Sequence, residues 1–160
     1  MNEETIQSGV TIERSDITSL AARDLISALN AELSCMYPEE GANHFRLDAD
    51  EVAEGRGAFV IVWRGDKAIG CGAVRRIEAG VGEFKRMYVI PEERGFGIGH
   101  LLVAALEAEA RALSLARLVL ETGVRQVAAI ALYRRVGFTE IAPWGEYAES
   151  PLSMCMAKDL

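Results

Sequence analysis

Long hydrophobic runs are missing from this sequence. Apolar stretches such as Ala58–Trp63 and Leu101–Leu106 have six residues each, whereas a membrane-spanning helix needs about 20. The opening residues, MNEETIQSGV, also lack the basic start and the apolar stretch of a signal peptide. We therefore expect a cytoplasmic protein without a membrane span.

Cysteine and histidine are sparse. The three cysteines, Cys35, Cys71 and Cys155, are widely spaced and form no Cys-x-x-Cys pair, and the two histidines, His44 and His100, do not cluster with them. Metal sites and disulfide frameworks depend on such clusters or on an even cysteine count. The sequence therefore predicts free thiols that pack as small apolar side chains, and it predicts no metal.

Basic residues are outnumbered. Seventeen Lys and Arg stand against 24 Asp and Glu, which gives a net charge of −7 and a sequence pI near 4.9. Proteins that bind nucleic acid usually present a basic face, so such a partner is not expected, whereas a cationic substrate such as an amine would be attracted. With 50% hydrophobic and 26% charged residues, the chain suits one folded domain, residues 1–160.

The spacing of apolar residues and turn residues predicts strands that alternate with helices. Asp16 is expected to cap a first helix that ends near Pro38. The helices predicted after it are Leu47–Glu54, Gly97–Leu113 and Gln126–Val136. The predicted strands are Gly9–Arg14, Ala58–Arg64, Lys67–Ile77, Gly82–Val89, Leu115–Thr122, Phe138–Ile141 and Leu152–Lys158. This order indicates a mixed α/β domain with an antiparallel half and a βαβ crossover.

Glycines recur at every second position between a predicted strand and a helix, in the segment Arg94-Gly95-Phe96-Gly97-Ile98-Gly99. Free amides in the first turn of a helix, together with the helix dipole, bind phosphate groups. The plainer interpretation is a tight strand-to-helix turn. A dinucleotide-binding GxGxxG motif fails because His100 or Leu102 stands where its last glycine should be, and no Lys-Ser or Lys-Thr follows to make a P-loop.

Three motifs of this sequence resemble those of a known family and occur in the same order as in that family. The Arg-x-x-Gly-x-Gly pattern of residues 94–99 resembles the pyrophosphate-binding loop of the GNAT family of N-acetyltransferases. Glu83–Val89 with Pro91 resembles the fourth strand of that family, and Ala129–Phe138 resembles its A-x-x-L-Y-x-x-x-G-F signature. The resemblance covers about residues 58–158. It implies a central, mostly antiparallel twisted sheet of about six to seven strands, with a βαβ crossover and about four helices.

The same resemblance implies that acetyl-CoA, the acetyl donor, lies in a V-shaped opening where the fourth and fifth strands separate. Backbone groups of Met87, Tyr88 and Val89 would pair with its pantetheine arm like an added strand. Gln126 stands where the family usually has Asn, and it would contact the same arm. Amides for the pyrophosphate are expected from Arg94, Gly95, Phe96, Gly97, Ile98, Gly99 and His100.

Transfer to an amine needs a base for the amine and an acid for the departing thiolate. The resemblance implies that the Tyr133 hydroxyl is the general acid, although a core position beside Phe138 would also explain this tyrosine. It implies that Glu83 or Glu121 is the base, with equal weight, and that the other orients the substrate. Each glutamate could instead be a solvated strand-edge carboxylate or the ion-pair partner of a nearby cation: Lys85, Arg86 or Arg117.

Two variable loops contain the candidates for contact with the acceptor, because loops often carry binding residues, although capping of the core explains each of them equally well. We expect a small or amino-acid-like primary amine as acceptor, with direct transfer in a ternary complex. A peptide or protein amine and a CoA-binding sensor without activity are the alternatives. Dimers are common in the family, so the resemblance also allows a homodimer. The candidate acceptor-binding residues are Tyr37, His44, Phe45, Trp144 and Tyr147.

Overall fold

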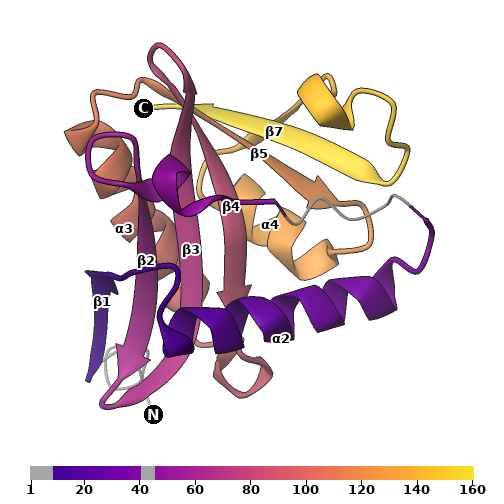
Figure 1. Ribbon diagram of the computed structural model, residues 1–160. Coiled ribbons are helices and arrows are strands. Elements are labelled where there is room, and N and C mark those ends of the chain that lie inside the picture. Colours follow the sequence, from indigo (N-terminus) through magenta and orange to yellow (C-terminus); the bar gives the residue numbers. More distant parts are fainter. Residues whose placement is uncertain (1–8, 41–45) are drawn as a thin grey trace.

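Seven strands form one sheet in the computed structural model, which describes residues 9–40 and 46–160 (Figure 1). Their order is β1-β2-β3-β4-β5-β7-β6. In this part of the chain the β4–β5 pair is parallel and the other neighbours are antiparallel. The strands are β1 (Val10–Arg14), β2 (Gly57–Arg64), β3 (Lys67–Glu78), β4 (Val81–Val89), β5 (Arg117–Gly123), β6 (Thr139–Ile141) and β7 (Ser153–Asp159).

The described residues contain three α-helices and three short 3₁₀ helices. The second predicted helix, Leu47–Glu54, is the short 3₁₀ helix η1, so this part of the chain has three α-helices instead of the expected four. The α-helices are α2 (Leu20–Met36), α3 (Ile98–Ala112) and α4 (Val127–Arg135), and the 3₁₀ helices are η1 (Ala49–Val52), η2 (Pro91–Glu93) and η3 (Gly145–Tyr147). The predicted mixed α/β sheet and its β4–α3–β5 crossover are confirmed, with each predicted strand found within a few residues of its expected bounds.

The start of α2 corrects one prediction. The Ser19 hydroxyl caps the helix by accepting a hydrogen bond from the Ala22 amide at 3.2 Å. The Asp16 carboxylate, the predicted cap, instead accepts from the amide and the hydroxyl of Thr18 at 2.8 and 2.7 Å. Asp16 therefore stabilises the turn that leads into the helix, because an aspartate can close either structure and the sequence does not distinguish them.

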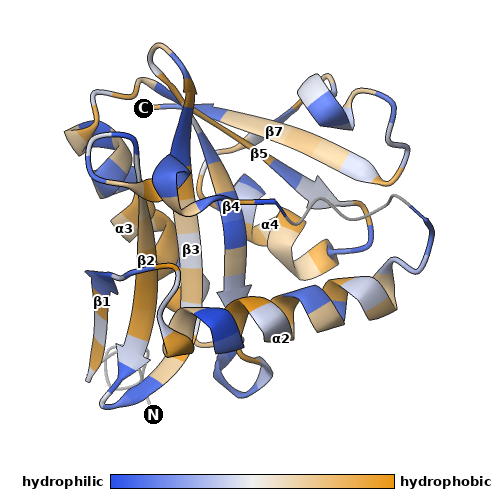
Figure 2. Cartoon of the chain, in the orientation of Figure 1, coloured by the Kyte–Doolittle hydropathy of each residue, from blue (hydrophilic) through white to orange (hydrophobic). Residues whose placement is uncertain are grey.

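Helices cover both faces of the sheet. α2 runs across one face, and α3 and α4 cover the other (Figure 1). β2 is buried on both sides, since Ala58, Val60 and Val62 join the core under α3 whereas Phe59 and Ile61 join the core under α2. This explains why β2 is a continuous apolar run instead of an alternating one, visible as its orange colour in Figure 2.

A β-bulge bends β4. Between the pairs Ala73–Lys85 and Cys71–Tyr88, two residues of β4 stand opposite a single residue of β3. The first of the two, Arg86, has a φ of 56°, a value that is uncommon for residues other than glycine. Bulges of this kind increase the local bend and twist of a strand.

The bend coincides with the separation of β4 from β5. The two strands pair in parallel from Val81 opposite Arg117 to Phe84 opposite Leu120, and their ladder ends there. β4 continues to Val89 and β5 to Gly123 without further pairing between them. The predicted opening between the fourth and fifth strands is therefore present.

The cysteines follow the sequence prediction in two of three cases. All three thiols are free, and Cys71 and Cys155 are buried. Cys35 is exposed on α2, so its predicted packing in the core is wrong.

None of the helices in the described part of the chain combines the length and the apolar character needed to cross a membrane.

Candidate active site

The turn between β4 and α3 presents a row of free backbone amides. Gly95 and Gly97 have φ values of 85° and 87°, in the left-handed region that favours glycine. Within residues 9–40 and 46–160, the amides of residues 95–100 donate to no acceptor. They lie at the positive end of the α3 dipole, so the turn suits an anion such as phosphate. The Arg94 amide is already used, because it donates to the Pro91 carbonyl at 3.3 Å.

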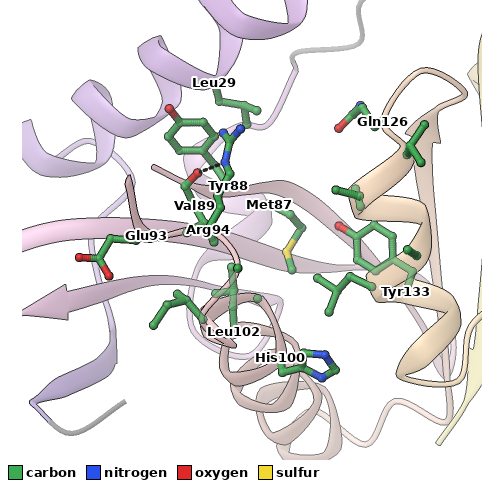
Figure 3. Close-up of a pocket in the computed structure, with 18 of the residues that line it drawn as sticks. Leu29, Met87, Tyr88, Val89, Glu93, Arg94, His100, Leu102, Gln126 and Tyr133 are labelled. Carbon is green, nitrogen blue, oxygen red and sulfur yellow. Dashed lines mark hydrogen bonds between the residues drawn. The ribbon is translucent and has the colours of Figure 1, made fainter. Parts of the chain in front are cut away.

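A cavity of about 780 Å³ opens beside this turn, between α2, β4, α3 and α4 (Figure 3). Its volume lies within the range of small-molecule and cofactor sites. The Phe96 side chain is 42% exposed and is not part of the lining, so only its backbone could contribute. The predicted cofactor-binding residues that line the cavity are Met87, Tyr88, Val89, Arg94, Gly95, Gly97, Ile98, Gly99, His100 and Gln126.

The Arg94 side chain fastens the turn to its surroundings. Its Nε donates to the Val89 carbonyl at 2.8 Å, and its two terminal nitrogens pair with the Glu32 carboxylate on α2 at 2.9 and 3.0 Å. The guanidinium also lies 5.5 Å from the centre of the Tyr88 ring, within the range of a cation–π contact. Arg94 thus positions the turn, with its charge matched by Glu32.

Tyr133 packs in the core and also borders the cavity. Its ring packs edge-on against Phe138, with 5.8 Å between the ring centroids, and the side chain is buried. It also lines the cavity, and its hydroxyl points from α4 toward Met87 on β4 (Figure 3). Burial, with a further contribution from the charge of Glu121, raises the pKa of Tyr133. The hydroxyl therefore holds a proton at neutral pH that it can donate.

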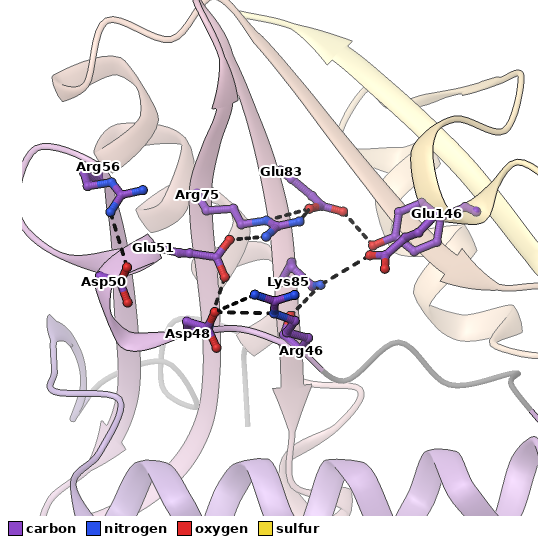
Figure 4. Close-up of polar contacts among 10 residues, drawn as sticks. Arg46, Asp48, Asp50, Glu51, Arg56, Arg75, Glu83, Lys85 and Glu146 are labelled. Carbon is purple, nitrogen blue, oxygen red and sulfur yellow. Dashed lines mark hydrogen bonds and ion pairs between the residues drawn. The ribbon is translucent and has the colours of Figure 1, made fainter.

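Glu83 is enclosed in a polar network on the α2 face of the sheet (Figure 4). Its carboxylate is completely buried and accepts hydrogen bonds from Arg75 Nε and from the Tyr147 hydroxyl, both at 2.8 Å. Arg75 also pairs with Glu51 on η1. The prediction of a solvated carboxylate, or of a pair with a cation of β4 or β5, is wrong, because the partner cation comes from β3.

Glu121 occupies a different environment. It follows Leu120, the last residue of β5 that pairs with β4, so it stands where the two strands separate. Its side chain is partly exposed. After burial, its negative charge is a further cause of the raised pKa of Tyr133, of Tyr37 and of the Cys155 thiol, which places it among the groups around the opening.

Tyr37 joins the end of α2 to the loop between β5 and α4. Its hydroxyl accepts a hydrogen bond from the Arg125 amide at 2.7 Å, and the Arg125 guanidinium lies 5.0 Å from its ring centre. Arg125 in turn donates to the Met36 carbonyl at 2.8 Å and pairs with Glu39 at 2.5 Å. Tyr37 is 4% exposed, so its main contacts are with the protein.

The remaining predicted acceptor residues differ in exposure. Tyr147 is 1% exposed, and burial together with the neighbouring Glu83 raises the pKa of its hydroxyl. Trp144 lies edge-on to Tyr147, with 5.1 Å between the ring centroids, and is partly exposed. His44 and Phe45 lie outside the described residues.

Sequence reasoning missed the role of Lys85 in this network. Its Nζ donates to the Arg46 carbonyl at 2.7 Å and lies 4.0 Å from the Glu146 carboxylate (Figure 4). Burial lowers the pKa of Lys85. The signal in the sequence was a lysine in an otherwise buried strand, but its partners come from the segment before η1 and from η3, which the sequence does not place.

Comparisons with known proteins agree with this geometry. The model of the acetyltransferase (GNAT) family matches residues 23–138. An IAA acetyltransferase of Azospirillum brasilense is 43% identical over 152 residues, which cover 94% of this chain and 98% of that protein. A Klebsiella pneumoniae protein, provisionally described as an acyl-CoA N-acyltransferase, has a crystal structure with a TM-score of 0.79 at 36% identity, covering 94% and 97% of the two chains. A GNAT family acetyltransferase of Elizabethkingia anophelis, crystallised with acetyl-CoA bound, has a TM-score of 0.68 at 17% identity, covering 96% and 99%.

Proposed function

The chain belongs to the GNAT acetyltransferase family, and from this premise we propose that it transfers the acetyl group of acetyl-CoA directly to a primary amine of a small molecule in a ternary complex. The observation that carries the proposal is the row of free amides at residues 95–100, on a cavity that extends to Tyr133. Such amides fit a pyrophosphate, which is the anionic part of CoA.

The residues that would hold the donor lie along the cavity. The amides of residues 95–100 would bind the pyrophosphate, and the edge of β4 at Met87–Val89, which β5 leaves uncovered, would bind the pantetheine arm as an added strand. Gln126 lines the cavity just before α4 and would contact the same arm. Arg94 would act indirectly, by holding the turn.

Acetyl-CoA supplies the acetyl group as a thioester. An amine with a pKa near 10.4 is neutral only about once in a few thousand molecules at pH 7, so a base has to accept its proton. We assign this role to Glu121, because it is partly exposed at the opening, whereas Glu83 is buried and bonded to Arg75 and Tyr147. As the nitrogen bonds to the acetyl carbon and the carbon–sulfur bond breaks, the Tyr133 hydroxyl donates a proton to the sulfur.

The acceptor would approach from the α2 face of the sheet. Trp144 is partly exposed there, and Tyr37 and Tyr147 form buried walls on the same side. The position of Tyr147 is fixed by its hydrogen bond to Glu83, so we assign Glu83 the orienting role that the sequence left to one of the two glutamates. The surplus of acidic residues in the chain favours a cationic amine.

A thiol-release assay tests the proposal. Acetyl-CoA is incubated with the protein and a panel of amines, amino acids, lysine-containing peptides and IAA, the compound in the name of the Azospirillum brasilense relative. We expect release of CoA above background with at least one small amine, and the acetylated product should be seen by mass spectrometry. Turnover with peptides alone would replace the small-molecule acceptor, and CoA binding without any turnover would support a sensor.

A further inference from the structure

Most charged side chains that line the cavity are neutralised by a partner. Three ion pairs account for them, with nitrogen–oxygen distances between 2.5 and 2.9 Å: Glu32–Arg94, Glu93–Arg64 and Glu39–Arg125. Arg135 also lines the cavity, and within residues 9–40 and 46–160 its guanidinium has no hydrogen bond or ion pair. In a chain with 24 acidic residues, an arginine without a carboxylate at a cavity wall suggests an anionic ligand.

Arg135 lies close to the turn with the free amides. A Cβ atom added at Gly99, in the first turn of α3, would come within 2.8 Å of Leu132 Cδ2, so the two helices touch at this point. Arg135 follows Leu132 by three residues and therefore lies on the same face of α4. His100 follows Gly99 directly and lines the cavity as well (Figure 3). Arg135 and His100 thus flank the contact between α3 and α4.

We infer that Arg135 and His100 form a second phosphate subsite, which recognises the 3′-phosphate of CoA. The inference rests on the proposed function. In CoA the pyrophosphate is attached to the 5′ position of the ribose and the separate phosphate to its 3′ position, so the two anions are one sugar apart. In the protein, Arg135 and His100 likewise lie next to the amides that would bind the pyrophosphate. A guanidinium matches a phosphate group with two parallel hydrogen bonds, and an imidazole N–H adds a third donor.

Comparison with the neighbouring arginine separates the effect of position from that of charge. A cation in the last turn of a helix interacts favourably with the helix dipole, which would explain an arginine here without any ligand. Arg134 and Arg135 are both exposed in the last turn of α4 and gain equally from the dipole. Of these two, Arg135 is the one that lines the cavity. The position of Arg135, and not merely its charge, therefore points to the ligand.

Isothermal titration with CoA and with 3′-dephospho-CoA tests the subsite, because the two ligands differ only in the phosphate concerned. We expect the wild-type protein to bind CoA about tenfold more tightly than 3′-dephospho-CoA, and R135Q to reduce this ratio to about twofold, mainly by weakening CoA binding. H100Q should reduce the ratio less. R134Q removes the same charge one residue away and serves as the matched control, with the wild-type ratio.

The outcomes separate the subsite from the proposed function. Equal affinity of the wild-type protein for the two ligands overturns the subsite and leaves the acetyltransferase proposal intact. An equal loss of both affinities in R135Q also overturns the subsite, since Arg135 would then act on the pyrophosphate or through general attraction. Failure of the wild-type protein to bind either ligand overturns the proposed function and the subsite together.

Discussion

The parallel pair β4–β5 consists of a closed half and an open half. In the closed half, from Val81 to Phe84, the strands are hydrogen-bonded, and Glu83 is buried among Arg75 and Tyr147. In the open half the ladder is absent, and the groups around the gap include Glu121, Tyr133 and a row of free amides. The closed half satisfies its polar groups internally, whereas the open half leaves backbone amides that a ligand can satisfy.

This difference separates two glutamates that look alike in the sequence. Both lie on neighbouring strands of the same sheet, and Glu83 pairs in register with Val119, two residues before Glu121. Glu83 lies within the ladder, and its carboxylate is buried and accepts two hydrogen bonds. Glu121 lies just past the last paired residue of β5 and is partly exposed. The role of each carboxylate thus depends on where the strands separate.

The largest effect should come from removing the buried carboxylate of the closed half. Glu83→Ala leaves Arg75 with one acidic partner and removes the buried hydrogen bond from the Tyr147 hydroxyl to Glu83, so the free energy of unfolding should fall by about 3 kcal/mol. Urea denaturation measures it. Glu140→Ala, at an exposed glutamate of β6, is the control and should stay within about 0.5 kcal/mol of the wild type. A loss below about 1 kcal/mol for Glu83→Ala would mean that the closed half is not a structural unit.

The next effect concerns the acid of the open half. Tyr133→Phe keeps the ring that packs on Phe138 and removes the proton donor, so kcat should fall about 100-fold. CoA affinity, measured by titration calorimetry, should change less than about twofold, because the phosphate-binding amides are untouched. Unchanged kcat would return Tyr133 to a purely structural role.

Comparing the two glutamates directly gives a smaller effect. Glu121→Gln should lower kcat/KM at least about tenfold, since the amide cannot accept a proton from the amine. Glu83→Gln can still accept a hydrogen bond from Tyr147 and should stay within about threefold of the wild type. Both are measured by thiol release between pH 6 and 9. The opposite order would reassign the base, and near-normal turnover of both variants would exclude a carboxylate base altogether.

The smallest expected change is in the alkaline pH profile. Burial raises the pKa of Tyr133 above its usual value near 10, so the hydroxyl stays protonated further into the alkaline range. At saturating acceptor, kcat should therefore rise as the amine loses its proton and should not decline below about pH 10. A decline at lower pH that is absent from Tyr133→Phe would show that the tyrosine loses its proton early.

Local patterns in the sequence predicted the fold and the turn. The apolar run of β2 and the glycine pattern at 94–99 depend on residues next to one another, so their structural meaning can be inferred without the fold. The same holds for the Tyr133 signature. The Asp16 cap failed although it is local, because the serine three residues later offers the same chemistry.

Contacts between distant residues could not be predicted. The Tyr147 hydroxyl reaches Glu83 across 64 positions, the Arg125 amide reaches Tyr37 across 88, and Arg94 reaches Glu32 across 62. Each pair depends on which elements the sheet order brings together, and hydrophobic periodicity carries no such information. For this reason the separation of Glu83 from Glu121 emerged only in the fold.

The bulge at Arg86 has a consequence for the length of β4. On either side of it, Phe84 and Met87 pack toward α3, although residues three apart on a regular strand face opposite sides of the sheet. The extra residue also shifts the pairing with β3 by one position between Ala73–Lys85 and Cys71–Tyr88. A chain from which Arg86 alone is deleted would thus continue the register of the Ala73–Lys85 pair to the end of β4, while every other β4 side chain kept its face. It should fold around the same core with a straighter strand, which would draw the edges together and narrow the gap between them. This deletion variant would test whether the fold persists when the opening between β4 and β5 is narrowed.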